Sequence, residues 1–249
     1  MELSHIVILF AVGIISAFLN VMAGGGSAIA LPVLIFMGLD SALANGTNRV
    51  AILIQNVFAV TSFHRQEVHA FRQSMRLTLW ALPGAIAGAV LGVTVSDEWF
   101  QRILAIVMIA TVFTILAPSK RAADVSEDAR RRRERWIYPI MFGIGIYGGF
   151  IQVSVGFLFM AALYHVLRMD LVMVNMHKVT IVMIYMVPAL AIYAWTGNVA
   201  WIPGLVLGAG SAVGGWWAAR VSVKGGESGI RIVLGIAMLV MAAKLLDLF

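Results

Sequence analysis

Two apolar stretches of this chain are too long for single membrane-spanning helices, and they constrain its fold more than any other feature. They cover residues 5–38 and 136–168. As a continuous helix, each would be roughly 50 Å long, whereas the hydrocarbon core of a bilayer is about 30 Å thick. We therefore predict that both stretches are broken or fold back within the membrane.

The other apolar stretches have the length of ordinary spans and indicate an all-α polytopic membrane protein. They cover residues 48–63, 77–95, 99–117, 178–196, 198–219 and 229–247. Hydrophobic residues make up 61% of the chain and charged residues only 12%, which excludes a water-soluble domain. The apolar runs are uninterrupted rather than alternating, which argues against an outer-membrane barrel. We expect residues 1–22 to be a retained segment rather than a signal peptide, because no basic residue precedes the apolar run.

The two overlong stretches head two similar halves, which we call the first half (residues 1–117) and the second half (residues 136–249). A polar, basic linker, residues 118–135, joins them and is predicted to be cytoplasmic. An offset of 130 residues places Gly24–Gly26 on Ser154–Gly156, Asp40 on Asp170, Asn45 on Asn175, Thr47 on His177 and Asn48 on Lys178. We therefore predict two homologous repeats, each with one broken or hairpin helix and three transmembrane helices.

The distribution of basic residues favours halves that have opposite orientations in the membrane. If both overlong stretches fold back, every Lys and Arg except Arg49, Arg102 and Lys244 lies on the side of the linker. If each stretch crosses once, the basic residues are spread more evenly over both sides. The positive-inside rule therefore predicts inverted repeats. The formal net charge of +6 comes mostly from the linker, so it indicates topology rather than a nucleic-acid partner.

The sequence GGGS at residues 24–27 predicts a helix end followed by a new helix. Glycine tolerates positive φ and is costly inside a helix, so Gly24, Gly25 and Gly26 suit a turn. A helix that starts at Ser27 presents N–H groups without intrahelical partners, and such an end attracts anions. We interpret the turn as a candidate substrate site, with a merely architectural turn as the alternative.

Polar side chains near the two turns extend this candidate site. They are Asn45, Thr47, Asn48 and Arg49 in the first half and Gln152, Ser154, Asn175, His177 and Lys178 in the second half. Arg49 and Lys178 either bind substrate or anchor segment ends at the membrane interface. His177 is a candidate for proton coupling. Gln55 and Asn56 either line the same cavity or bond between helices.

Other chemistries have no visible parts in the sequence. No carboxylate lies in the middle of an apolar stretch, so a cation route has no candidates. The chain has no cysteine, Walker motif or H-E-x-x-H, so we predict no catalytic residue, metal site or cofactor. Asp40 and Asp170 are expected to cap helices. Gly84, Gly88 and Gly92 are spaced for close helix packing, either within the chain or in a homo-oligomer.

The segment AGGGSAIALPVLIFMGL, followed by ALANGTNR, resembles the signature of the TauE/SafE sulfite exporter family. The second half is similar as well, with its own glycine-containing turn and VNMHK, so the resemblance covers essentially the whole chain. The positions that match the family pattern are Gly24, Gly25, Gly26, Pro32, Asn45, Thr47 and Asn48. The second half departs from the pattern, because Ser154 and Val155 replace two glycines and Ala162 replaces a proline. The resemblance implies transport of small sulfur-containing anions across the bacterial cytoplasmic membrane.

Together these observations predict a multi-pass carrier of the cytoplasmic membrane with a central site rich in hydrogen-bond donors and cations. The residues alone indicate a small anionic substrate, and the resemblance narrows it to sulfite, an organosulfonate or a related oxyanion. The expected surroundings are the lipid bilayer, without nucleic acid. The alternative hypothesis is a non-transporting membrane protein, such as a scaffold, an assembly factor or a small-molecule receptor.

Overall fold

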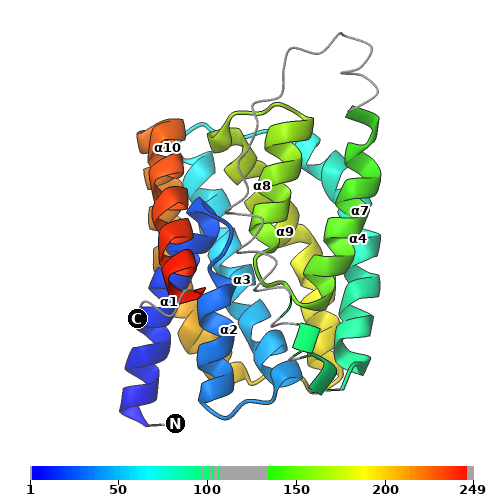
Figure 1. The fold of residues 1–249 in the computed structure, drawn as a ribbon, viewed down its shortest axis with the longest axis vertical. Helices are drawn as coiled ribbons and strands as arrows, with labels where there is room; N and C mark the ends of the chain where they lie inside the picture. Colours follow the sequence, from blue (N-terminus) through cyan, green and yellow to red (C-terminus); the bar gives the residue numbers. More distant parts are fainter. Residues whose placement is uncertain (1, 97, 101, 104–105, 107–133, 246–249) are drawn as a thin grey trace.

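The computed structural model describes residues 2–96, 98–100, 102–103, 106 and 134–245. These residues form helices and connecting turns without a strand, which confirms the predicted all-α fold class. Figure 1 shows the helices packed side by side as an elongated bundle. Their bounds are α1 Leu3–Met22, α2 Ser27–Phe36, α3 Ser41–His64, α4 Phe71–Thr94, α7 Ile137–Phe150, α8 Val155–Val166, α9 Leu171–Trp195 and α10 Trp201–Leu245. Most of the predicted linker and of the apolar stretch 99–117 lies outside the described residues.

The first overlong stretch is broken at its glycine run, as predicted. Helix α1 ends at Met22 and α2 begins at Ser27. The N–H groups of Ala23 and Gly24 both donate to the carbonyl of Leu19, at 2.7 and 3.1 Å, and close the last turn of α1. Gly24 then adopts a φ of +91°, which a residue with a side chain rarely adopts.

The second overlong stretch is also broken, between the end of α7 at Phe150 and the start of α8 at Val155. Here the positive φ values fall on Gln152 (66°) and Ser154 (58°) rather than on glycine. A non-glycine residue in this region costs of order 1–3 kcal/mol, so the surrounding packing must hold it in place. The second break is therefore a more strained version of the first.

Each broken stretch folds back on itself as a helical hairpin (Figure 1). We call α1 with α2 the first hairpin and α7 with α8 the second hairpin. In the first hairpin, His5 and Leu9 from the start of α1 line the same cavity as Leu34 and Met37 from the end of α2. The first hairpin opens toward the end of the bundle that holds the N-terminus, and the second opens toward the opposite end. Their turns meet in the interior.

Glycines bring α4 and α7 into close parallel contact. A Cβ on Gly84 would overlap the carbonyl of Phe142, and one on Gly88 would overlap the carbonyl of Ile146. Contact positions that increase together along both helices mean that the helices run in the same direction. The predicted packing role of these glycines is thus realised within the chain.

The same relationship joins α1 and α10. A Cβ on Gly210 would overlap the carbonyl of Phe10, and one on Gly214 would overlap the carbonyl of Ile14. Thus the first helix of each half lies parallel to a later helix of the other half. In Figure 1, α1 rises from the N-terminus whereas α7 descends from the opposite end, so these corresponding helices run in opposite directions.

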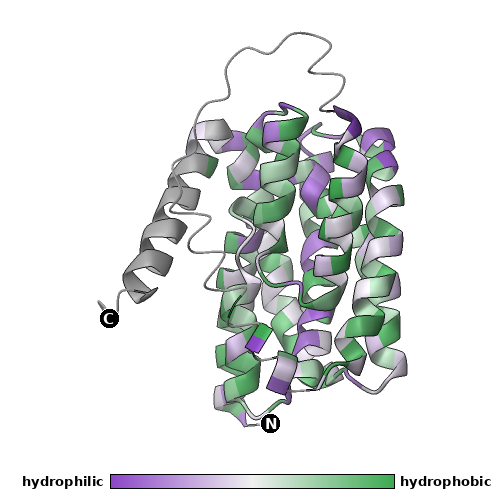
Figure 2. Ribbon diagram, turned by 45° about the vertical axis from the view of Figure 1, so that its right-hand side comes forward, coloured by the Kyte–Doolittle hydropathy of each residue, from purple (hydrophilic) through white to green (hydrophobic). Residues whose placement is uncertain are grey.

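Length and surface composition suit a membrane. Within the described residues, three helices are long and apolar enough to cross a bilayer: α1, α4 and α9. Large apolar side chains such as Leu3, Phe36 and Trp195 are exposed on the outside of the bundle. Hydrophobic colours cover much of its length in Figure 2. An exposed apolar surface of this kind is stable against lipid rather than water.

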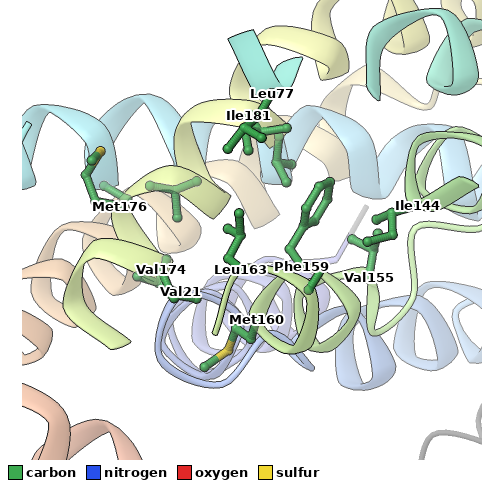
Figure 3. Close-up of a cluster of buried hydrophobic side chains, with 14 of the residues drawn as sticks. Val21, Leu77, Ile144, Val155, Phe159, Met160, Leu163, Val174, Met176 and Ile181 are labelled. Atoms are coloured by element: carbon green, nitrogen blue, oxygen red, sulfur yellow. The ribbon is translucent and has the colours of Figure 1, made fainter. Parts of the chain in front are cut away.

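A buried apolar cluster ties the hairpins to the long helices (Figure 3). Phe159 of α8 lies in this cluster with Val21 of α1, Leu77 of α4, Ile144 of α7 and Ile181 of α9. The cluster draws on both halves, so it fixes the turns of both hairpins relative to the same core.

α10 contains a further break. Gly226 has φ 55° and ψ −156° inside the range Trp201–Leu245, so the range comprises two helices. The predicted apolar stretches 198–219 and 229–247 lie on either side of this glycine.

Candidate functional site

Arg49 binds the carboxyl end of α7. Its side chain is fully buried on α3. Nη1 donates to the carbonyl of Gly148 at 3.3 Å, and Nη2 donates to the carbonyls of Gly149 and Phe150, the latter at 3.2 Å. The guanidinium also lies 4.3 Å from the centroid of the Tyr193 ring. Arg49 is thus held by backbone oxygens and an aromatic face inside the bundle, which excludes its interpretation as an interfacial anchor.

Lys178 binds the carboxyl end of α1 in the same manner. Its side chain is 2% exposed on α9. Nζ donates to the carbonyls of Asn20 and Val21, at 3.1 and 2.7 Å, and to Oδ1 of Asn175 at 2.9 Å. An ammonium has three N–H groups, so all of its donors are used. Lys178 therefore does not reach a membrane surface either.

Two asparagines complete these contacts from the same helices as the cations. Asn45 of α3 donates through Nδ2 to the carbonyl of Phe150 at 2.8 Å and to the hydroxyl of Tyr193 at 2.7 Å. Asn175 of α9 donates to the carbonyl of Met22 at 3.5 Å and to the Ser222 hydroxyl at 3.3 Å. These two asparagines are aligned in the predicted repeat, and each binds the hairpin of the other half.

We call these contacts the cross-caps: Arg49 and Asn45 bind the end of α7, and Lys178 and Asn175 bind the end of α1. The last carbonyls of a helix have no intrahelical donors and carry partial negative charge. Away from water, such carbonyls cost several kcal/mol each unless another group pairs with them. Each half thus supplies the donors that allow the other half's hairpin to turn inside the bundle.

Two further aligned residues bind the starts of helices. The hydroxyl of Thr47 accepts from the N–H of Ala200, just before α10, at 2.9 Å. Nδ1 of His177 shares a 2.8 Å hydrogen bond with the hydroxyl of Ser74, in the first turn of α4. Both contacts again cross from one half to the other, so in this arrangement Thr47 and His177 hold the starts of helices.

The aspartates behave unequally at the helix starts. Oδ1 of Asp170 accepts from the N–H of Met173 at 2.9 Å and caps α9, which confirms the expectation for that residue. Asp40 occupies the same position before α3, but its side chain makes no capping bond.

A small polar cavity lies where the last turn of α1 meets the second break. It has a volume of about 10 Å³, which is room for about one water molecule. Its walls come from α1, α3, the second break, α8 and α9. The lining residues are Asn20, Gln55, Asn56, Gln152, Val155, Gly156, Lys178, Val179 and Val182.

A chain of amides directs a free donor toward this cavity. Nδ2 of Asn20 donates to Oε1 of Gln55 at 3.3 Å, and Nε2 of Gln55 donates to Oδ1 of Asn56 at 3.4 Å. The chain ends at Nδ2 of Asn56, which is buried and has no hydrogen-bond partner. A buried amide without a partner costs about 1–3 kcal/mol, and a ligand that accepts its hydrogen bond would recover that energy.

Two other lining residues, Gln152 and Lys178, add further donor character. Oε1 of Gln152 accepts from the hydroxyl of Tyr185 at 3.0 Å, which leaves the amide nitrogen as the free end of that side chain. Lys178 contributes the positive charge. No aspartate or glutamate is among the lining residues. The cavity therefore suits an anion, because no carboxylate in its walls would repel one.

The predicted site residues divide into three groups, and Asn48 belongs to none of them. Gln152 and Lys178 line the cavity. Asn45, Thr47, Arg49, Asn175 and His177 hold helix ends, while Gly24, Gly25, Gly26, Ser27 and Ser154 form the turns or the adjoining helix start. Asn48 is buried, and its Nδ2 has no hydrogen-bond partner, but it does not line the cavity.

Asn20 was not predicted. It is the only amide in the largely apolar helix α1, and this isolation is the signal that could have identified it.

Two other features fall outside this site. A cavity of about 240 Å³ near the start of α1 is lined almost entirely by apolar side chains, with His5 as the only titratable group. In the part of the chain that the structure describes, no group of three or more His, Asp or Glu side chains could hold a metal ion.

Comparison with known proteins gives a consistent picture. The family described as "Sulfite exporter TauE/SafE" matches residues 9–245. A "Probable membrane transporter protein" of Haemophilus influenzae is 25% identical over 96% of this chain and 93% of its own length. The "Probable membrane transporter protein YfcA" of Escherichia coli K12 is 26% identical over 96% and 88%, and the "Probable membrane transporter protein ORF9" of a Sinorhizobium species is 25% identical over 96% and 91%. No solved structure matches this chain.

Proposed function

Because this chain belongs to the TauE/SafE sulfite exporter family, we propose that it is a multi-pass carrier of the bacterial cytoplasmic membrane for a small anion. The substrate class is sulfite, an organosulfonate or a related sulfur-containing oxyanion. The observation that carries the proposal is the cavity where the end of α1 meets the second break, because Asn56, with its free amide, and the cation Lys178 line it and no carboxylate does.

The arrangement of the hairpins supports a carrier mechanism. Helices α1 and α7 run in opposite directions, and their hairpins open toward opposite ends of the bundle (Figure 1). Inverted repeats with broken helices commonly place the substrate site at the midplane and expose it alternately to either side. We interpret the two halves as such inverted repeats, with the cavity at their interface.

The small volume of the cavity indicates a closed state of the carrier. A volume of about 10 Å³ does not admit an oxyanion such as sulfite. The two hairpins must therefore move apart for substrate to enter, and the present arrangement is a closed one. The contact between the hairpin turns is then part of the gate.

Transport and binding assays test this function. Purified protein in liposomes should take up sulfite or a C2–C3 sulfonate, and the same anions should raise its melting temperature. Taurine, a zwitterion, should bind less well because the positive charge of Lys178 repels its ammonium group. Transport of a cation with every anion inert would contradict the proposal, and a protein that neither transports nor is stabilised by any ligand would support a scaffold instead.

A variant of Asn56 tests the cavity itself. Asn56→Leu keeps the size of the side chain but removes the free donor, so anion affinity should fall by about 10–100-fold. Gln73→Leu removes an exposed amide from α4 and should leave affinity unchanged. Equal affinity in both variants would place the substrate elsewhere.

A further inference from the structure

The ammonium of Lys178 lies in a cluster of oxygen atoms at a broken helix end. The carbonyls of Asn20 and Val21 and Oδ1 of Asn175 surround Nζ at 3.1, 2.7 and 2.9 Å. The next carbonyl, that of Met22, is held by Nδ2 of Asn175 at 3.5 Å. Backbone and amide oxygens are the ligands that alkali cations prefer in proteins.

Such helix ends are places where membrane carriers bind soluble cations. The carboxyl end of a broken helix carries partial negative charge, and the unwound carbonyls beyond it coordinate Na⁺ or similar ions. In this protein the end of α1 is already neutralised by a side chain. The partial negative charge at the end of α7 is also neutralised, because the guanidinium of Arg49 binds the carbonyls of Gly148, Gly149 and Phe150.

We propose that Lys178 and Arg49 are tethered counter-ions that occupy two cation sites at the ends of α1 and α7. A carrier with covalently attached cations at these positions needs neither Na⁺ nor K⁺ to bind its anion. The statement about the anion rests on the proposed function, whereas the cation site at the end of α1 can be tested without any substrate.

The two sites differ in what could replace the side chain. Lys178 places a compact ammonium at the end of a flexible chain, and a monovalent cation of similar size can take its place. Arg49 places a planar group that also covers the Tyr193 ring, which no spherical ion reproduces. Lys178 is therefore the residue to remove.

Lys178→Ala should create a binding site for a soluble monovalent cation. We expect ammonium or potassium chloride to raise the melting temperature of this variant by about 2–4 °C over choline chloride at equal ionic strength. Choline is too large to enter. Lys178→Met fills the space without a charge and should show no such difference.

The wild type and Lys224→Ala are the other controls. Lys224 is an exposed lysine of α10, so its removal changes net charge without opening a buried site. Neither protein should distinguish ammonium from choline. The proposal is wrong if Lys178→Ala responds to these salts no more than Lys178→Met does. A Lys178→Ala protein that fails to fold even in ammonium chloride also contradicts it, because the bound cation should restore the caps of α1.

A second experiment uses the wild-type protein and tests whether anion binding requires Na⁺ or K⁺. Replacing all Na⁺ and K⁺ by choline should leave stabilisation by sulfite, and its uptake into liposomes, unchanged within about twofold. A strict requirement for Na⁺ would overturn the proposal. If sulfite has no effect in any salt, the proposed substrate fails, but the salt response of Lys178→Ala still decides whether a cation site exists.

Discussion

Gly24 and Gly156 are in backbone contact where the two hairpin turns meet. A Cβ on either residue would overlap backbone atoms of the other. One glycine belongs to the break that follows α1, and the other lies in the first turn of α8. The two hairpin turns thus approach each other through residues without side chains, beside the polar cavity that Gly156 also lines.

Gly156→Ala should destabilise the protein by about 1–3 kcal/mol, because the added methyl group pushes the two turns apart. Gly143→Ala is the matched control, since a Cβ at Gly143 in α7 meets nothing within 4 Å. That change should be neutral or stabilise by about 0.5–1 kcal/mol through its helix propensity. Denaturation of both purified variants measures the difference. Similar stabilities would mean that the hairpins are not pressed together as described.

Neighbouring glycines of the first turn should differ in their tolerance of a side chain. A Cβ on Gly26 would overlap the carbonyl of Ser16, which is backbone inside α1 and cannot move aside. A Cβ on Gly25 meets only the ring of Phe157, at 2.7 Å, and a ring can rotate. We therefore expect Gly26→Ala to lose transport and Gly25→Ala to retain most of it, with both measured at equal amounts of protein in the membrane. The reverse order would contradict this geometry.

Arg49→Lys should behave as a severe substitution although it keeps the charge. The guanidinium contacts the carbonyls of three successive residues and a tyrosine face, and an ammonium cannot reproduce that planar fork. A loss of about 1–3 kcal/mol is expected from the carbonyls left without donors. Arg102→Lys changes an exposed arginine paired with Glu98 and should have little effect. Thermal unfolding of both variants in detergent makes the comparison.

Accessibility labelling tests the inverted orientation. The chain has no cysteine, so single cysteines at Asn198 and Ser228 can be labelled with an impermeant reagent. Asn198 lies between α9 and α10, and Ser228 lies just beyond the Gly226 break at the other end of the first part of α10. We expect Asn198 to react from outside the cell and Ser228 only after the membrane is opened. A cysteine at Ser126 in the linker should behave as Ser228 does, and labelling of Asn198 and Ser126 from the same side would exclude the topology.

The sequence was sufficient to predict the fold class and the first helix break. A stretch too long for one span, with three adjacent glycines in it, leaves few alternatives, and α2 begins at Ser27 as predicted. The geometry of the second break was harder to infer, because its positive φ values fall on Gln152 and Ser154, residue types that carry no signal for them. Their conformation is imposed by tertiary packing rather than by local preference.

The partners of Arg49 and Lys178 could not have been inferred from sequence alone. The pattern identified both cations and their neighbouring positions in the predicted repeat, but their acceptors are backbone carbonyls about a hundred residues away or more. Every residue has a carbonyl, so no residue type marks the acceptor. The same limit explains why most predicted site residues serve the framework, while Asn20 was missed as part of the cavity wall.

The cross-caps also bear on how the protein is made. When the ribosome has inserted only the first half, the carbonyls at the end of α1 lack the donors that Lys178 and Asn175 will supply, because α9 has not yet been synthesised. The first hairpin therefore cannot settle at its final depth until most of the chain has entered the membrane. Early in biosynthesis, residues 1–36 should be held near the insertion machinery or the lipid headgroups, where water and polar groups satisfy the unpaired carbonyls. Proteins truncated before α9 should be targets for membrane quality-control proteases.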